Sequence, residues 1–148
     1  MTNSPQDFST FLVGDHYFAV DAALVQEVIP AVPVTPVPLT TAEVDGLINL
    51  RGRIVLAMNL QRRLALPETP PAPSQANLIV HTSDGLVSLL VDQLGDVISL
   101  DRKQLEPLPP SVQGAIRELA LGVFQLQDSL LILLDVSRVA TQEVCVKT

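Results

Sequence analysis

The sequence predicts an all-β protein made of two similar, barrel-like lobes. Short apolar runs alternate with turn signals along most of the chain, which is typical of small barrels and sandwiches. Residues 46–60 and 122–136 align without a gap, apolar opposite apolar and polar opposite polar, and the shift from 46 to 122 is 76 residues. A lobe of about 70 residues buries too little apolar surface to be stable alone. We therefore expect two lobes that are related by a pseudo-twofold axis and share one core.

The predicted strands are short and lie between turns. Gly14-Asp15 and Asp84-Gly85 mark two hairpin turns, because glycine and aspartate favour the conformations that join neighbouring strands. The phrases that follow the two hairpins are also related, which extends the repeat beyond its ungapped part. In chain order, the predicted strands are 11–13, 17–20, 32–37, 47–50, 54–58, 78–80, 86–91, 97–100, 123–126 and 130–134.

Helix is scarce in this pattern. Residues 67–75 contain four prolines and predict an extended surface loop between two halves of the chain. A rigid spacer explains this composition better than a proline-rich ligand for a recognition domain. Asp135 can serve as the N-cap of one short helix. The predicted helical turns are 22–28, 60–64, 112–119 and 135–140.

The turn between the paired strands differs between the two copies of the repeat. Residues 51–53 read Arg-Gly-Arg, whereas residues 127–129 opposite them read Gln-Asp-Ser. An altered, positively charged turn on a duplicated core indicates a binding surface rather than catalysis. The nearby Arg62 and Arg63 fit either a solvated helix face or a part of the same basic region, and the sequence leaves that open.

Charge and cysteine content exclude several classes of function. With 16 acidic and 9 basic residues the chain has a net charge of −7, which argues against a general affinity for nucleic acid. Its one cysteine, Cys145, cannot form an intrachain disulfide, so a cytoplasmic location is expected by default. The sequence has neither a signal peptide nor a run of about 20 apolar residues, so we expect no direct insertion into a membrane.

The sequence contains no recognisable pattern for catalysis or cofactor binding. The two histidines, His16 and His81, occupy equivalent hairpins and lack metal-ligand spacing with the cysteine. No phosphate-binding loop, nucleophile elbow or local pair of nucleophile and base occurs. We therefore expect no metal, no cofactor and no enzyme activity. The glycines interpreted as turn residues after the hairpins are Gly46, Gly52, Gly85 and Gly122.

The first copy of the repeat also carries a family signature. The stretch VDGLINLRGRIV, residues 44–55, closely resembles the GxxNLRG signature of the CheW-like family, whose members couple chemoreceptors to a sensor histidine kinase in bacterial chemosensory arrays. The upstream phrase FLVGDHYFAVDAALVQEVI and the downstream phrase LLVDQLGDVISLDRKQLEPLP resemble further parts of the family pattern. The similarity thus extends over nearly the whole chain, from Phe8 to Ala140.

The resemblance implies a more specific version of the predicted fold. It is a single domain, residues 8–140, in which two small five-stranded SH3-like β-barrel lobes intertwine around a shared core, with pseudo-twofold symmetry and a few short helices. Residues 1–7 and 141–148 would then be terminal tails.

The resemblance also implies a non-enzymatic scaffold, or adaptor, in signal transduction. Such a protein binds the regulatory domain of a CheA-type histidine kinase, which is a homologue of the same fold. It also binds the helical cytoplasmic tip of a methyl-accepting chemotaxis receptor in the groove between its lobes. The output would be chemotaxis or pilus-driven motility, and the protein, a monomer in isolation, would join membrane receptor arrays through its partners. Two alternatives stay open: a freestanding family member that binds other regulators, and a small enzyme with a site in the interlobe groove.

Site residues follow from the resemblance by position. Arg51 matches the arginine of the signature, and its planar fork suits a carboxylate or the carbonyls at a helix end. Val25 and Val28 are expected on a short helical turn, Val28 in the core and Val25 either in the core or on the surface. Ile54 is expected in the interlobe core. The implied partner-binding residues are Arg51, Val25, Glu27, Val28 and Arg53, and the implied turn-stabilising residues are Asn49 and Gly52.

The chain departs from the family pattern just after the signature. Leu56 stands where the family often has a proline, and Asn59-Leu60-Gln61 stands in place of Asp-Leu-Arg. These changes remove an acidic and a basic group near the expected partner surface. They leave open which receptors and kinases the protein serves.

Overall fold

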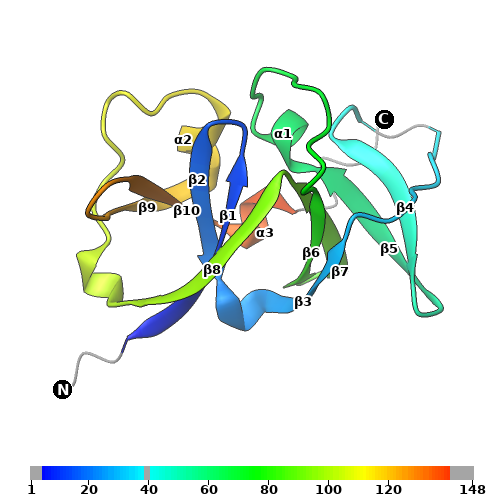
Figure 1. Ribbon diagram of the computed structural model, residues 1–148, viewed down its shortest axis with the longest axis horizontal. Coiled ribbons are helices and arrows are strands. Elements are labelled where there is room, and N and C mark those ends of the chain that lie inside the picture. The colour runs from blue at the N-terminus through cyan, green and yellow to red at the C-terminus, as the bar shows by residue number, and fades with distance from the viewer. Residues whose placement is uncertain (1–4, 39–40, 141–148) are drawn as a thin grey trace.

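Two curved five-stranded sheets lie beside each other and form the body of the protein (Figure 1). The structure is a computed structural model that describes residues 5–38 and 41–140. The sheet of lobe A has the strand order β8 (Gln93–Leu100), β1 (Gln6–Val13), β2 (His16–Asp21), β10 (Leu130–Leu134) and β9 (Ala120–Gln125). The sheet of lobe B has the order β3 (Val25–Pro30), β6 (Ala76–Thr82), β7 (Gly85–Val91), β5 (Arg53–Asn59) and β4 (Val44–Leu50). The prediction of an all-β fold with two five-stranded lobes is confirmed.

Each lobe takes strands from both halves of the chain. Lobe A joins the first hairpin, β1–β2, to the three late strands, and lobe B joins the second hairpin, β6–β7, to β3, β4 and β5. The pairing pattern is the same in both lobes: one strand pair is parallel, β2 with β10 and β7 with β5, and the others are antiparallel. The pseudo-twofold relation predicted from the repeat is therefore present in the hydrogen-bond pattern. β1 also begins at Gln6, inside the segment expected to be a tail.

A strap after the outer strand closes each barrel, and the two straps are equivalent. Thr35 exchanges two backbone hydrogen bonds of 2.8 Å with Leu47 in lobe B, and Glu106 does the same with Val123 in lobe A at 2.8 and 2.9 Å. The predicted strand 32–37 is reduced to this single bridge. Pro33 and Pro36, on either side of Thr35, have no amide hydrogen with which to continue a ladder.

Two of the glycines interpreted as turn residues lie instead beneath these straps. Gly46 is in β4 and Gly122 is in β9. A Cβ atom at Gly46 would come within 2.1 Å of the Thr35 carbonyl oxygen, and one at Gly122 within 2.5 Å of the Glu106 carbonyl oxygen. The turn interpretation was wrong for both, because what requires glycine is the close approach of a second backbone.

The hydrophobic core has three parts, one between the lobes and one inside each barrel. The interlobe core packs side chains of both sheets against the short helices, and its largest fully buried members include Phe11, Phe18, Met58, Leu78 and Leu89. The interior of lobe A is built on Phe8, Phe124 and Leu131, and that of lobe B on Ile48, Val55 and Ile79. The shared core predicted from the small size of each lobe is thus the main contact between them.

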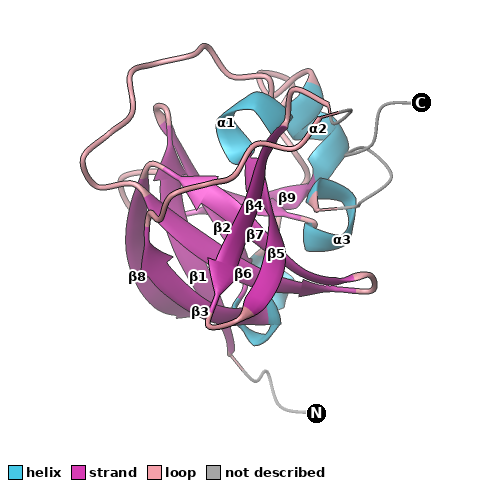
Figure 2. Cartoon of the chain, turned by 90° about the vertical axis from the view of Figure 1, so that its right-hand side faces the viewer, coloured by secondary structure: helices cyan, strands magenta, loops and turns pink. Residues whose placement is uncertain are grey.

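The helices are short: in Figure 2, α1 and α2 lie above the sheets and α3 lies beside them, while further helical turns lie at the opposite, lower end. Asn59 and Asp135, which are aligned in the repeat, cap α1 and α3: their side chains accept hydrogen bonds of 3.1 Å from the amides of Arg62 and Ser137. No helix in the described ranges is long and apolar enough to cross a membrane. The helical elements are η1 (Ala22–Leu24), α1 (Leu60–Arg63), η2 (Arg102–Gln104), α2 (Ala115–Leu119) and α3 (Val136–Val139).

Candidate functional site

The basic turn of the first repeat copy is a tight hairpin between β4 and β5. Arg51 and Gly52 both have positive φ, +51° and +85°, as in the two-residue turns whose twist matches that of the flanking strands. The Asn49 carboxamide oxygen accepts a hydrogen bond of 2.8 Å from the Gly52 amide. This contact supports a conformation that costs energy for a residue with a Cβ atom. The Arg51 side chain is 70% exposed, so the strained residue is also the one presented to solvent.

Arg51 forms an ion pair with Glu27 of β3. The two residues come from opposite edges of the lobe B sheet, which are brought together by its curvature. The structure therefore joins two residues that the resemblance assigned separately to partner binding. A single Nη atom of Arg51 makes this contact, while the Glu27 side chain is only 22% exposed. An ion pair of this kind stabilises a fold by about 0–1 kcal/mol, so it orients the arginine more than it holds the barrel closed.

A shallow cavity of about 240 Å³ lies beside this ion pair. We call it the arginine-turn pocket; Gln26, Glu27, Leu50, Arg51, Arg53 and Leu86 line it. The Gln26 side chain is held by His81, whose Nε2 atom lies 2.5 Å from the Gln26 Oε1 atom. The pocket thus combines two arginines, one carboxylate and two leucines. Sequence reasoning missed Gln26, Leu86 and His81, because only the pairing of β3 with β6 and the approach of the turn bring them together.

Val25 and Val28 lie in strand β3, not on a helical turn, so that prediction was wrong beyond Leu24. Residues 25–30 pair with β6 from the other half of the chain, and this pairing outweighs the weak local preference for helix. Val25 packs partly against the interlobe core. Val28 is 45% exposed, which contradicts its expected place in the core. Exposed side chains alternate with partly buried ones along β3, and Val28 belongs to the exposed set with Gln26 and Pro30. Val97 in the equivalent edge strand β8 is 62% exposed.

Ile54 is likewise exposed, at 66%, and its expected burial in the interlobe core was wrong. It shares a face of β5 with Leu56 and Met58, which do pack in or against that core. The strand alternation was therefore assigned correctly, but Ile54 lies at the hairpin end of the strand, beyond the edge of the core. Together with Val28 it adds apolar surface to lobe B.

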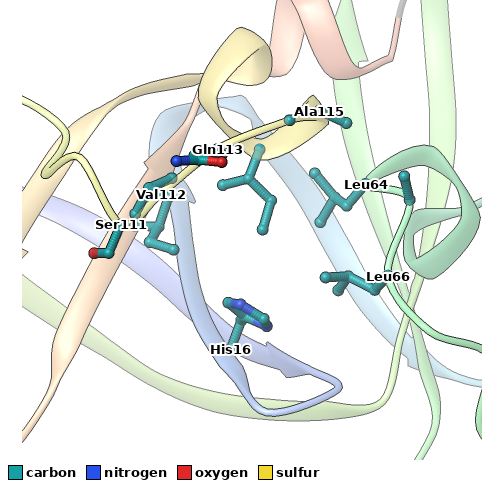
Figure 3. A pocket seen from close by; sticks show the side chains of 11 residues that line it. His16, Leu64, Leu66, Ser111, Val112, Gln113 and Ala115 are labelled. Atoms are coloured by element: carbon teal, nitrogen blue, oxygen red, sulfur yellow. The ribbon is translucent and has the colours of Figure 1, made fainter.

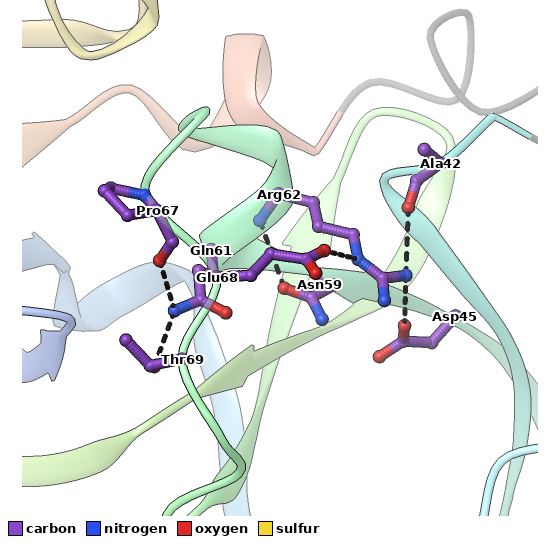
Figure 4. A network of polar contacts seen from close by, with 8 residues as sticks. All are labelled: Ala42, Asp45, Asn59, Gln61, Arg62, Pro67, Glu68 and Thr69. Atoms are coloured by element: carbon purple, nitrogen blue, oxygen red, sulfur yellow. Dashed lines mark hydrogen bonds and ion pairs between the residues drawn. The ribbon is translucent and has the colours of Figure 1, made fainter.

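Arg62 belongs to a separate polar network that joins α1 to β4 and to the proline-rich loop (Figure 4). Its guanidinium lies 3.5 Å from an Asp45 oxygen and 3.0 Å from Glu68 Oε1, and donates to the Ala42 carbonyl at 3.4 Å. The neighbouring Gln61 side chain donates to the Pro67 carbonyl at 3.1 Å and to the Thr69 hydroxyl at 2.9 Å. Gln61, one of the departures from the family pattern, thus anchors the start of the 67–75 loop.

Arg63 connects the two lobes. It follows β5 of lobe B, and its guanidinium donates to the carbonyls of Val139 at 3.0 Å and Arg138 at 2.9 Å, at the end of α3, which follows β10 of lobe A. A cation at a helix C-terminus satisfies carbonyls that have no partner within the helix. Neither Arg62 nor Arg63 lines the arginine-turn pocket. The sequence left open whether they form a solvated helix face or belong to the basic region of the turn; in the structure both make contacts within the protein.

Two carboxyl groups near this network have shifted pKa values. Burial raises the pKa of Asp45, and the nearby Arg62 only partly offsets that effect. A hydrogen bond from the Thr41 side chain lowers the pKa of Glu43. No cluster of three or more histidine, cysteine, aspartate or glutamate side chains suited to a metal ion occurs in residues 5–38 and 41–140. Cys145 and the segment 141–148 lie outside the described residues.

Comparison with known proteins places these features in a family. Residues 7–144 match the CheW-like domain. The chain is 28% identical over 143 residues to the chemotaxis protein CheW of Rhizobium meliloti, covering 97% of this chain and 92% of the relative. It is 31% identical over 122 residues to protein FrzA of Myxococcus xanthus, covering 81% and 74%. The crystal structure of the scaffolding protein TtCheW from Thermoanaerobacter tengcongensis superposes with a TM-score of 0.85 over 95% of each chain, at 25% identity. The chain therefore belongs to the CheW-like domain family.

Proposed function

We propose that this protein is a non-enzymatic scaffold that couples chemoreceptors to a CheA-type histidine kinase. The arginine-turn pocket is the observation that carries the proposal, because it combines an exposed Arg51 with the apolar side chains of Leu50 and Leu86. Val28, which follows Glu27 in β3, is also exposed. The names of the relatives support the same assignment: one is a chemotaxis protein CheW and the similar solved structure is a scaffolding protein. The output is chemotaxis or pilus-driven motility, and the site of action is the cytoplasmic face of a receptor array.

The chemistry of the pocket suits a helical partner. The Arg51 fork has donors beyond the one that contacts Glu27, and these can bind a partner carboxylate or the carbonyls at a helix end. Val28 and Ile54 supply apolar side chains that an amphipathic helix or a strand edge can cover. An apolar anchor beside an arginine is a common composition of interface hot spots.

A small interface is sufficient for this role. Contacts that bury less than about 1,200 Å² are typical of transient signalling complexes. In an array many such contacts act together, so that avidity stabilises the assembly while each contact can still be switched. We assign the receptor tip and the regulatory domain of the kinase as the two partners, the second being a homologue of the same fold.

The test is a binding assay with purified wild-type protein and two variants. The receptor cytoplasmic fragment and the kinase regulatory domain are taken from the same organism. Arg51→Glu should weaken binding of at least one partner by tenfold or more, because it places a carboxylate beside Glu27 and removes the donor fork. Arg102→Glu, an identical change on the exposed η2 of lobe A, should bind like wild type. The free energy of unfolding of Arg51→Glu should differ from that of wild type by less than about 1 kcal/mol.

Failure of the wild-type protein to bind either partner would refute the scaffold assignment. Equal binding by wild type and Arg51→Glu would refute the location of the interface. A loss of stability that matches the loss of binding would make Arg51 a structural residue.

A further inference from the structure

A second cavity lies between the lobes, away from the arginine-turn pocket (Figure 3). Its volume is about 330 Å³. His16, at the start of β2, forms one wall, residues 64–66 after α1 form the second, and residues 111–116, which lead into α2, form the third. His16 belongs to lobe A. Residues 64–66 follow β5 of lobe B and the short helix α1, so both lobes contribute to the lining. We call it the interlobe cavity.

The lining of the interlobe cavity is about equally polar and apolar, and it contains no aspartate, glutamate, lysine or arginine. Leu64, Leu66, Val112, Ile116 and Ile132 supply aliphatic surface. The hydrogen-bonding side chains are those of His16, Ser111 and Gln113, and Gln113 already donates to the Pro110 carbonyl at 3.3 Å. A volume of this size is at the lower end of the range of small-molecule sites. An ionised ligand would meet no aspartate, glutamate, lysine or arginine among these lining residues, so the cavity favours an uncharged one.

His16 carries an unsatisfied polar atom at this cavity. Its Nδ1 atom is buried and has no hydrogen-bond partner, which is true of no other buried side-chain nitrogen or oxygen in the described part of the chain. The ring stacks on Phe18 with centroids 5.8 Å apart, so packing holds its plane. A buried polar atom without a partner costs stability, and in native proteins it calls for an explanation such as a ligand.

His16 and Leu66 also border a smaller cavity of about 170 Å³, lined further by Gly14, Asp15, Pro67 and Thr69. The side chains of His16 and Leu66 therefore lie between the interlobe cavity and this smaller cavity. A rotation of the imidazole about its Cβ–Cγ bond would exchange the position of Nδ1 with that of a ring carbon and turn the nitrogen toward the other side. Binding from the interlobe cavity requires such a rotation, because the Nδ1 atom is buried in the structure.

We propose that the interlobe cavity binds a small, uncharged molecule that has an apolar ring and one N–H or O–H group, which donates a hydrogen bond to His16 Nδ1. This inference goes beyond the scaffold function, because it gives the protein a chemical input of its own. Since both lobes line the cavity, a bound molecule would contact both of them.

The test uses indole as the probe, a neutral, apolar bicycle with a single N–H donor. The chain has only two histidines, so ring nitrogen spectra of the full-length protein resolve His16 beside an internal control, His81. Indole should shift the His16 signals and the Gly114 amide signal in a saturable way, with a dissociation constant of about 1 mM, as expected for so few atoms. The His81 signals should not move. Indole-3-acetate, which has the same ring and a negative charge, should bind at least tenfold more weakly.

Two variants locate the binding. Ala115→Leu fills the cavity and should abolish the Gly114 shift, whereas Ala23→Leu, the same change at an exposed residue of η1, should bind indole like wild type. His16→Phe keeps a ring but removes the acceptor, and should lower the affinity about fivefold. Absence of saturable shifts in the folded wild-type protein would overturn the proposal, and so would binding that is unaffected by both Ala115→Leu and His16→Phe. None of these outcomes depends on receptor or kinase binding, so the scaffold assignment is tested separately.

Discussion

At the residue scale, the proposed function depends on an arginine whose conformation and contacts are both unusual. Arg51 has positive φ in a tight turn and pairs with Glu27 from the opposite edge of the sheet. Asn49 supports the turn from within the same hairpin. The position of the arginine could be expected from the sequence by resemblance, but its pairing with Glu27 could not, because that contact depends on the curvature of the sheet.

The sequence predicted which face of a sheet a side chain lies on better than whether that side chain is buried. Ile54 follows the same alternation as Met58 and Leu56, and the sequence contains no signal for the point where the core ends. Val28 was misplaced because it was expected on a helical turn, whereas it belongs to the exposed set of side chains along strand β3. Alternation thus determines which face a side chain joins, but the extent of the neighbouring lobe determines whether that face is covered.

The exposure of Ile54 leads to a prediction about Ile54→Asp. The variant should fold, with a melting temperature within a few degrees of wild type, because exposed substitutions usually change stability by less than about 0.5 kcal/mol. Met58→Asp, on the same face of the same strand, should not fold, because it places an unpaired charge in the interlobe core. Circular dichroism melting curves compare the two. An unfolded Ile54→Asp beside a folded Met58→Asp would reverse the assignment of the core edge.

Asp45 gives the protein a predictable pH dependence. Its pKa is raised by burial, so between the ordinary aspartate value and the raised value the folded state binds more protons than the unfolded state. Stability therefore falls as pH rises through that window, and the penalty persists at neutral pH. Asp45→Asn removes this penalty and leaves Arg62 its contact with Glu68.

The Asp45→Asn variant should accordingly be more stable than wild type at pH 7, and the difference should shrink as the pH falls through the raised pKa of Asp45 toward the ordinary aspartate value of about 4. Urea unfolding at a series of pH values measures the difference. The lowered pKa of Glu43 acts in the opposite direction, since its contribution is lost at acid pH, but it is common to both proteins and cancels in the comparison. A variant that is less stable at pH 7, with a gap that closes in acid, would mean that the Arg62 ion pair outweighs burial.

At the element scale, contacts between distant segments decide the outcome where local signals are weak. β3 forms because β6, from the other half of the chain, pairs with it along Val25–Pro30, although the sequence suggested helix there. The capped helices are the reverse case: Asn59 and Asp135 fix the starts of α1 and α3 through local hydrogen bonds. The cap of α3 could therefore be predicted from the sequence, while the strand could not.

The strap over β9 leads to a prediction about Gly122. Gly122→Ala should destabilise the protein by about 2 kcal/mol or more, because its Cβ would lie 2.5 Å from the Glu106 carbonyl oxygen and force the strap away. Leu121→Ala, at the neighbouring residue that is 41% exposed, should cost about 1 kcal/mol or less. Chemical denaturation of both variants provides the comparison. Equal stability of Gly122→Ala and wild type would show that the strap is loosely packed.

At the scale of the whole molecule, the duplication predicted from the sequence is realised as two lobes that exchange strands. The ungapped repeat contains only the later strand pair of each half, so it indicates two lobes but not which half supplies each strand. The interlobe core and the contact of Arg63 with α3 then join the lobes into one unit. A scaffold needs such rigidity, because a partner on one lobe can affect a partner on the other only if the lobes move together.

The central claim is that Arg51 contacts a partner and does not merely brace the barrel, and a charge-swapped double variant, Glu27→Arg with Arg51→Glu, tests it most directly. The swap restores an ion pair across the end of lobe B with reversed polarity, so thermal stability should return to the wild-type value. Binding of the receptor fragment and of the kinase regulatory domain is then measured by calorimetry. The account predicts that binding of at least one partner stays tenfold or more weaker than wild type. Full recovery of both affinities in the swapped protein would contradict it, because the ion pair alone, and not the arginine at the surface, would then be what partners require.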